Sequence, residues 1–287
     1  MKKVLKKIVL LSIICVEFFQ VKDLKALIPD YYQPTQKNLS KESLSIGKSA
    51  YQLLYFGQIK DSLNLAKLAV KINQSNETLW TILAEAQIAN KLYEDALISL
   101  NKAQKIKPKM GEIYFAKSTI YLKQSKIKEA KFALKEGIKI IPRNFRAIFQ
   151  LGNIYLMEKN YEKAIEEFEK AIAIKKDFWQ AINNQGLAYF ELDKINLSII
   201  YFEKAIAIED NAEPLLALAS CLRLKNINEA ILLAKRALIK EPNYVEYDYR
   251  KEQLWGEKLQ KSTTKLFQNN QLEKEIILAK TKIINPS

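Results

Sequence analysis

Apolar residues gather in segments rich in alanine and leucine, and turns of two to four residues separate these segments through most of the chain. This pattern predicts helices joined by tight turns. Small residues recur in it every 34 positions, with a last spacing of 32; they are Ser62, Ala96, Ala130, Ala164, Ser198 and Ala230. A second series runs seven positions later, from Ala69 to Ala237. Because such a period is typical of a solenoid of helix–turn–helix units, we predict an all-α fold.

The period divides the chain into six units, each predicted to hold a helix A and a helix B. Their ranges are 43–76, 77–110, 111–144, 145–178, 179–211 and 212–244. Small residues such as Gly152 and Gly186 lie where helix A must approach helix B closely, because a larger side chain would push the helices apart. Pro108, Pro142 and Pro242 end helix B, since proline cannot continue a helical hydrogen-bond ladder. A stack of such units presents a long curved surface and usually works by binding.

The period ends after Tyr244, and two further helical patterns follow. Residues 247–267 and 271–283 each carry apolar residues at helical spacing. We expect the segment 245–287 to form C-terminal capping helices, because the last unit of a solenoid otherwise leaves its apolar face bare.

The first 26 residues have the pattern of a secretory signal or a membrane anchor. Four lysines precede residue 8, and residues 8–16 are uncharged and mostly apolar. Charged residues then interrupt, so there is no clean apolar span of about 20 residues for a transmembrane helix. Three interpretations stay open: a signal cleaved after Ala26, an uncleaved anchor, and a cytoplasmic chain with an apolar N-terminus. Residues 29–42 contain two prolines, Pro29 and Pro34, and several Gln, Asn and Ser residues, and we expect an extended lead-in over 27–42.

The composition argues against most catalytic and metal-binding chemistry. The chain has no histidine, seven glycines without a phosphate-binding motif, and two distant cysteines that cannot form a zinc site. Cys221 lies among leucines and alanines and is expected to be a buried packing thiol. Chemistry by Asp, Glu, Lys or Tyr remains open in principle, but no such residues cluster. We therefore expect a protein that is not an enzyme and binds no metal or cofactor.

The net charge of +14 is unevenly distributed. Residues 101–146 hold 13 Lys and Arg against three acids, an excess of +10. Within this stretch four lysines are expected to form a basic ridge on helix B of the third unit: Lys128, Lys131, Lys135 and Lys139. The ridge could meet an anionic membrane surface or an acidic partner, or it could be a solvated face without a partner. A nucleic-acid binder is the alternative function, although arginine is scarce and no aromatic and basic groove is evident.

The unit 145–178 carries a recognisable set of residues: Leu151, Gly152, Tyr155, Tyr161, Ala164, Phe168 and Ala171. This set resembles the tetratricopeptide repeat (TPR) family, and six in-phase copies extend the resemblance over about 200 residues. The resemblance implies a right-handed solenoid that binds partner proteins along its concave side.

In that family the concave wall is made by helix A side chains at the second, fifth, ninth, twelfth and thirteenth repeat positions. In the middle three units the resemblance assigns to this wall Phe115, Thr119, Leu122, Arg146, Phe149, Asn153, Leu156, Met157, Asn183, Leu187 and Phe190. Asn153 and Asn183 would clamp the backbone of an extended peptide, while Phe115, Phe149 and Met157 would take its apolar side chains. Chaperone C-termini are not expected as ligands, because the basic residues that bind them in other family members have no match here.

Residues 178–187, 211–219 and 252–256 are also similar to a set of cyanobacterial and plastid TPR proteins, some of which assist photosystem assembly or chlorophyll synthesis at thylakoid membranes. The sequence therefore predicts a non-catalytic scaffold, exported or membrane-associated through residues 1–26, that serves as an assembly factor or adaptor. It is expected to bind one or a few proteins in the concave groove. The alternative is a nucleic-acid or anionic-surface binder that uses residues 101–146.

Overall fold

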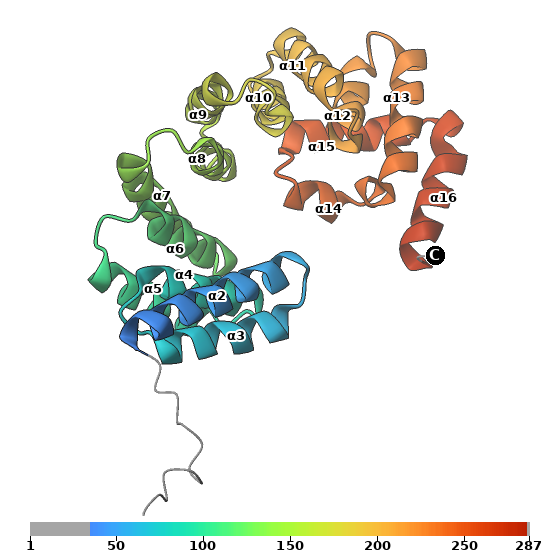
Figure 1. The fold of residues 1–287 in the computed structure, drawn as a ribbon. Helices are drawn as coiled ribbons and strands as arrows, with labels where there is room; N and C mark the ends of the chain where they lie inside the picture. Colours follow the sequence, from blue (N-terminus) through green and yellow to red (C-terminus); the bar gives the residue numbers. More distant parts are fainter. Residues whose placement is uncertain (1–34, 286–287) are drawn as a thin grey trace, which may run out of the picture.

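The computed structural model describes residues 35–285 of the chain. These residues fold as a curved stack of antiparallel helix pairs, which forms an open arc (Figure 1). The predicted signal or anchor over residues 1–26 lies outside the described residues, as do residues 27–34 of the predicted lead-in.

Six pairs of helices coincide with the six predicted units. The pairs are α2 (Gln36–Tyr55) with α3 (Ile59–Ile72), α4 (Glu77–Ala89) with α5 (Tyr93–Ile106), α6 (Gly111–Lys123) with α7 (Ile127–Ile140), α8 (Phe145–Met157) with α9 (Tyr161–Ile174), α10 (Trp179–Glu191) with α11 (Ile195–Ile208), and α12 (Ala212–Leu222) with α13 (Ile227–Lys240). Each helix packs against its partner and against the next pair, so the apolar core runs along the stack. The predicted all-α solenoid is therefore confirmed for the described part of the chain.

Close packing of helix A on helix B explains the small residues of the repeat. A methyl group on Gly152 would lie 2.5 Å from the ring of Phe168, and one on Gly186 would lie 2.6 Å from the ring of Phe202. Both rings are fully buried. Because protein interiors are packed at near-crystal density, these close contacts leave room only for glycine, which has no side-chain carbon.

The turn between helix A and helix B has the same backbone conformation in five units. One residue of each turn has a left-handed φ between 55° and 76°; these residues are Gly57, Lys91, Ser125, Lys159 and Asp193, which are spaced 34 positions apart. The following N–H reaches back into helix A, as Asn160 N–H does to the Tyr155 carbonyl at 2.8 Å. This geometry is the usual end of a helix with a left-handed residue after it.

The predicted extended lead-in over 27–42 is wrong for residues 36–42, which are helical. Thr35 caps the helix, because its hydroxyl accepts the Asn38 N–H at 3.2 Å. Ser43, Gly47 and Ala50 of α2 are buried, so packing against the neighbouring helices holds a segment whose polar composition did not predict a helix.

The predicted single helix over 247–267 is also wrong, because it is two helices. The C-terminal elements are η2 (Pro242–Val245), α14 (Tyr247–Glu252), α15 (Glu257–Phe267), η3 (Asn270–Leu272) and α16 (Glu273–Ile284). The break contains Leu254, whose φ of 66° is left-handed, and Gly256, which packs so closely on Glu191 that a methyl group would lie 2.2 Å from its carboxyl carbon. The break lets the chain turn back on itself.

Helices α15 and α16 lie on different parts of the last repeat units. Helix α16 packs on α13 and η2 and covers the end of the stack, while α15 packs on α10 and α12, the first helices of the last two pairs. Helices α14 and α15 thereby lie along the inner side of the arc (Figure 1). The inner face of the last two pairs is therefore covered by the protein's own chain.

Candidate functional site

The first helices of the first four pairs line an open groove of about 740 Å³ on the inner face. Its lining comes from α2, α4, α6 and α8 and includes Tyr51, Leu54, Tyr55, Glu85, Ile88, Ala89, Glu112, Phe115, Ala116, Thr119, Arg146 and Gln150. A concave site with apolar walls and a few polar groups is the usual form of a ligand-binding site.

The 34-residue repeat explains why these particular side chains face the groove. Tyr51, Glu85 and Thr119 are successive equivalents in neighbouring units, and so are Tyr55 and Ala89. Residues at one repeat position point in one direction when the units stack with a constant geometry. The groove is therefore a property of the stack, and its chemistry varies from unit to unit.

Three charged side chains lie in the groove lining. Within residues 35–285, the carboxylates of Glu85 and Glu112 form no ion pair or hydrogen bond. The guanidinium carbon of Arg146 lies 4.8 Å from the centre of the Phe145 ring. The protein around Glu85 removes part of its water, which raises the pKa of its carboxyl group above the usual value. The groove is thus more acidic than the rest of this basic protein.

Phe115, Thr119 and Arg146 lie in the groove lining, where the sequence predicted them. Leu122 is half-buried and is not among the residues that line the groove.

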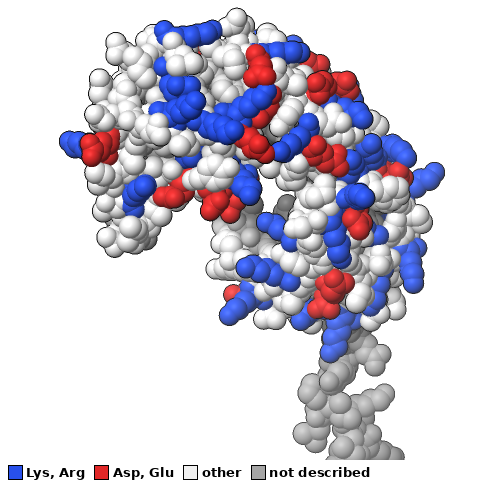
Figure 2. Space-filling view, turned by 180° about the vertical axis from the view of Figure 1, so that it is seen from behind, with Lys and Arg blue, Asp and Glu red and all other residues white. Residues whose placement is uncertain are grey.

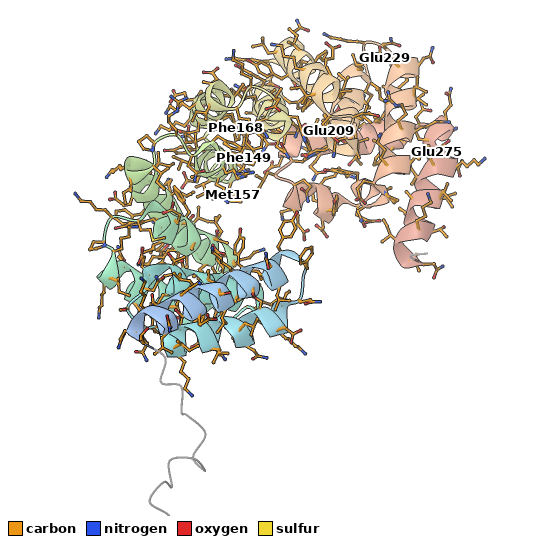
Figure 3. The ribbon with its side chains drawn as sticks, viewed as in Figure 1. Phe149, Met157, Phe168, Glu209, Glu229 and Glu275 are labelled. Carbon is orange, nitrogen blue, oxygen red and sulfur yellow. The ribbon has the colours of Figure 1, made fainter. Side chains whose placement is uncertain are left out.

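Helix α8 places its four other predicted residues differently. The ring of Phe149 packs on Phe178 at 4.9 Å and on Phe168 at 5.6 Å, so it belongs mainly to the core. Leu156 is buried, whereas Met157 is exposed at the inner edge of the arc (Figure 3). Asn153 accepts a hydrogen bond from the Asn184 amide at 2.8 Å.

The prediction that Asn183, Leu187 and Phe190 form part of an open groove wall is wrong. All three are buried, and Leu187 and Phe190 share a core cluster with Trp255 and Leu259 of the C-terminal segment. Asn183 donates to the side-chain oxygen of Asn184 at 3.1 Å, so its amide is used within the protein. A partner can reach these positions only when the C-terminal segment leaves them.

Polar contacts hold the start of α15 on the inner face. Glu191 of α10 accepts the backbone N–H of Leu259 at 3.0 Å and that of Lys258 at 3.3 Å, which satisfies two free donors at the helix N-terminus. One turn further along, the hydroxyls of Ser220 and Thr263 are 2.7 Å apart. These contacts join residues more than 40 positions apart in the sequence.

Glu213 of α12 lies at the centre of a second polar contact. Its carboxylate accepts the indole N–H of Trp255 at 3.1 Å, and Asn183 and Tyr244 also hydrogen-bond to it. Burial raises the pKa of Glu213 to about 7, although these hydrogen bonds stabilise the charged carboxylate and so lower the pKa in part. The C-terminal segment is thus attached through a carboxyl group that titrates near neutral pH.

Family comparisons agree with this architecture. A family model described as tetratricopeptide repeat matches residues 145–178, and a second model with the same description matches residues 111–144 and 180–211. The chain contains tetratricopeptide repeats. No curated protein matches the chain.

Several solved structures have similar folds. MamA is 25% identical, with 60% of this chain and 92% of that chain covered and a TM-score of 0.51. Pseudomonas aeruginosa pilF is 17% identical, with 75% and 98% covered and a TM-score of 0.62. YrrB, described as a TPR protein with an unusual peptide-binding site, is 18% identical, with 63% and 97% covered and a TM-score of 0.50. The predicted TPR solenoid is confirmed.

The sequence analysis missed Tyr51, Tyr55, Glu85 and Glu112, although the TPR register could have found them. Tyr51 and Glu85 hold the ninth repeat position, Tyr55 the thirteenth, and Glu112 the second. The predicted concave wall covers only the middle three repeats and leaves out Glu112 within them. Extending the same positions to the first two repeats would have predicted the open part of the groove.

The predicted basic ridge on α7 is divided in the structure. Lys131 pairs with Glu158 at 2.6 Å and Lys139 pairs with Glu136 at 2.5 Å, while Lys128 and Lys135 are exposed without an ion pair within residues 35–285. Figure 2 shows Lys and Arg spread over the visible face with Asp and Glu between them. Two of the four ridge lysines are therefore already neutralised.

Cys221 is buried, as predicted, and burial raises the pKa of its thiol to about 12. Among residues 35–285 no three His, Cys, Asp or Glu side chains are grouped so that they could hold a metal ion. In that part of the chain no helix combines the length and apolar character that crossing a membrane requires.

Proposed function

We propose that this protein is a non-catalytic scaffold that binds a segment of a partner protein in the groove formed by α2, α4, α6 and α8. The observation that carries the proposal is the open groove itself, in which Tyr51 and Tyr55 are 53% and 81% exposed. Exposed aromatic side chains in a concave surface are typical anchors for a partner. The unusual peptide-binding site described for YrrB supports the same use of the fold.

The proposal extends to an assembly factor or adaptor that is exported or membrane-associated. It rests on the charged and apolar pattern of residues 1–26, which lie outside the described structure. The comparisons above lend no support to the similarity with cyanobacterial and plastid TPR proteins, which stays a prediction. Fusion of residues 1–40 to a reporter, followed by fractionation of the cells, tests the location.

The groove is tested by partner capture with matched variants. The Tyr51→Ala/Tyr55→Ala protein removes two aromatic side chains that are largely exposed, so the fold should be retained. The control is Phe132→Ala/Ile239→Ala, which removes two exposed apolar side chains from α7 and α13, outside the groove lining. Tagged proteins are used to capture partners from a gently solubilised extract, and mass spectrometry identifies what they retain.

We expect a small set of proteins that the wild type and the control retain and the tyrosine variant loses. Equal recovery by all three proteins would reject the groove as the binding surface. Recovery of nucleic acid by all three, with affinity that falls steeply with salt, would instead favour the basic stretch 101–146.

A further inference from the structure

The carboxylate of Glu85 has no cationic partner among the described residues. It lies in the groove lining on α4, and within residues 35–285 it has neither an ion pair nor a hydrogen bond. Glu85 is solvent-exposed at the groove surface, and the protein around it raises the pKa of its carboxyl group by partial desolvation, with no described cation to oppose that shift. An exposed carboxylate without a cationic partner is available to a positive group of a ligand.

Aromatic rings line the groove together with this carboxylate. Tyr51 and Tyr55 come from α2 and Phe115 from α6, the helices before and after α4 in the row of first helices. The rings of Tyr55 and Phe56 lie nearly perpendicular to each other with their centroids 5.5 Å apart, and Tyr55 remains mostly exposed. Aromatic faces and a carboxylate together favour a cationic side chain, through cation–π attraction and a charge-assisted hydrogen bond.

The charge of the groove is opposite to that of the whole protein. The chain carries +14, yet the groove lining holds two carboxylates, Glu85 and Glu112, and one cation, Arg146. Arg146 is stacked on Phe145, and it does not pair with either carboxylate. The groove therefore attracts a positive group that the rest of the surface repels.

We infer that the groove contains a subsite for a Lys or Arg side chain of the partner segment, formed by Glu85 with Tyr51 and Tyr55 beside it. The inference rests on the proposed function and gives the partner its chemistry: a basic residue within an otherwise apolar segment. Glu112 adds a second carboxylate to the groove lining on α6.

The test uses pools of synthetic fluorescent peptides of about 12 residues, random except for one central residue. The central residue is Lys, Arg, norleucine or Glu, and binding is followed by fluorescence anisotropy. The wild type is compared with Glu85→Gln, which keeps the shape, and with Glu85→Lys, which reverses the charge. Glu166→Gln changes the net charge equally at an exposed site on α9 and serves as the control. Circular dichroism confirms that each variant is folded.

We expect the wild type and Glu166→Gln to prefer the Lys and Arg pools over the norleucine pool by about tenfold, the size of one charge-assisted hydrogen bond. Glu85→Gln should lose this preference, and Glu85→Lys should prefer the Glu pool. Equal binding of the Lys and norleucine pools by the wild type, an unchanged preference in Glu85→Gln, or no binding of any pool would overturn the inference. Saturable binding of tetramethylammonium, without any peptide preference, would assign the site to a small cation and overturn it as well.

Failure of this inference differs from failure of the proposed function. If partner capture is lost in Tyr51→Ala/Tyr55→Ala but the peptide pools show no charge preference, the groove binds partners without this subsite. If capture is unchanged in the tyrosine variant, the groove itself is rejected.

Discussion

The indole N–H of Trp255 donates a hydrogen bond to the carboxylate of Glu213 at 3.1 Å, and this contact attaches the C-terminal segment to the inner face of the last two repeats. Because α15 packs on α10 and α12, the open groove is confined to the first four repeats. The stability of this attachment decides how much of the concave face a partner can use.

The stability of the protein should depend on the ionisation of Glu213. Its pKa is about 7 in the folded chain and near 4.5 when exposed, so between these values the folded state holds a proton that the unfolded state has lost. The contribution of Glu213 to stability is therefore full below about pH 4.5, falls as the pH rises, and is lost above about pH 7. Glu213→Gln keeps an acceptor for Trp255 without the charge, and it should exceed the wild type at pH 8 by at least about 1 kcal/mol.

Thermal unfolding of the wild type and Glu213→Gln between pH 4.5 and pH 8 measures this difference. The gap should be close to zero at the acid end and should widen toward pH 8. Glu203→Gln, at an exposed position of α11, should follow the wild type at every pH. Parallel profiles for Glu213→Gln and the wild type would contradict the assignment.

Glu191→Ala should loosen the start of α15. The substitution removes the acceptor of the Lys258 and Leu259 N–H groups, and loss of a helix cap has an effect on the order of 1 kcal/mol. Hydrogen exchange at these two amides should become about fivefold faster or more, while exchange in α6 and α8 stays unchanged. Glu203→Ala is the control on α11. Unchanged protection of the Leu259 amide in Glu191→Ala would show that other contacts hold this end.

Gly152→Ala should destabilise the fourth repeat. The added methyl group would lie 2.5 Å from the fully buried Phe168 ring, so the two helices must separate or the ring must move. Overpacking of this kind costs about 1–3 kcal/mol. Urea unfolding measures the loss, with Lys163→Ala on the exposed face of α9 as the control. A Gly152→Ala protein as stable as the wild type would mean that this contact can relax freely.

Ser125→Gly should stabilise the protein slightly. Ser125 is exposed and has a φ of 58° in the turn between α6 and α7, where Gly57 fills the equivalent place in the first repeat. Left-handed backbone costs a residue with a side chain about 1 kcal/mol, and the greater freedom of glycine in the unfolded chain offsets part of the gain. The melting temperature should rise by a degree or more above both the wild type and Ser125→Ala. A lower melting temperature would show that the greater conformational freedom of glycine in the unfolded chain outweighs the relief of backbone strain in the folded one.

The repeated architecture follows from the local sequence pattern. Small residues at a period of 34 require helix A and helix B to meet at fixed points, as Gly152 meets Phe168, and this local rule recurs in every unit. The resemblance to the TPR family implied which positions face inward, and it placed Phe115 and Arg146 in the groove correctly. Local helix geometry and nearest-neighbour packing are enough for the repeated architecture, because a solenoid unit contacts mainly its neighbours.

Long-range packing sets which of the inward positions are open to a partner. Asn183 and Phe190 have groove positions in the repeat, yet they are buried beside the C-terminal segment. The burial depends on contacts such as Glu191 with Leu259, 68 positions apart, and on a break at Gly256 that allows the chain to return. A periodic pattern contains no information about a non-repeating segment that packs back onto the stack. The accessible part of the concave face is therefore set by the packing of the C-terminal segment, which is not part of the repeat, on α10 and α12.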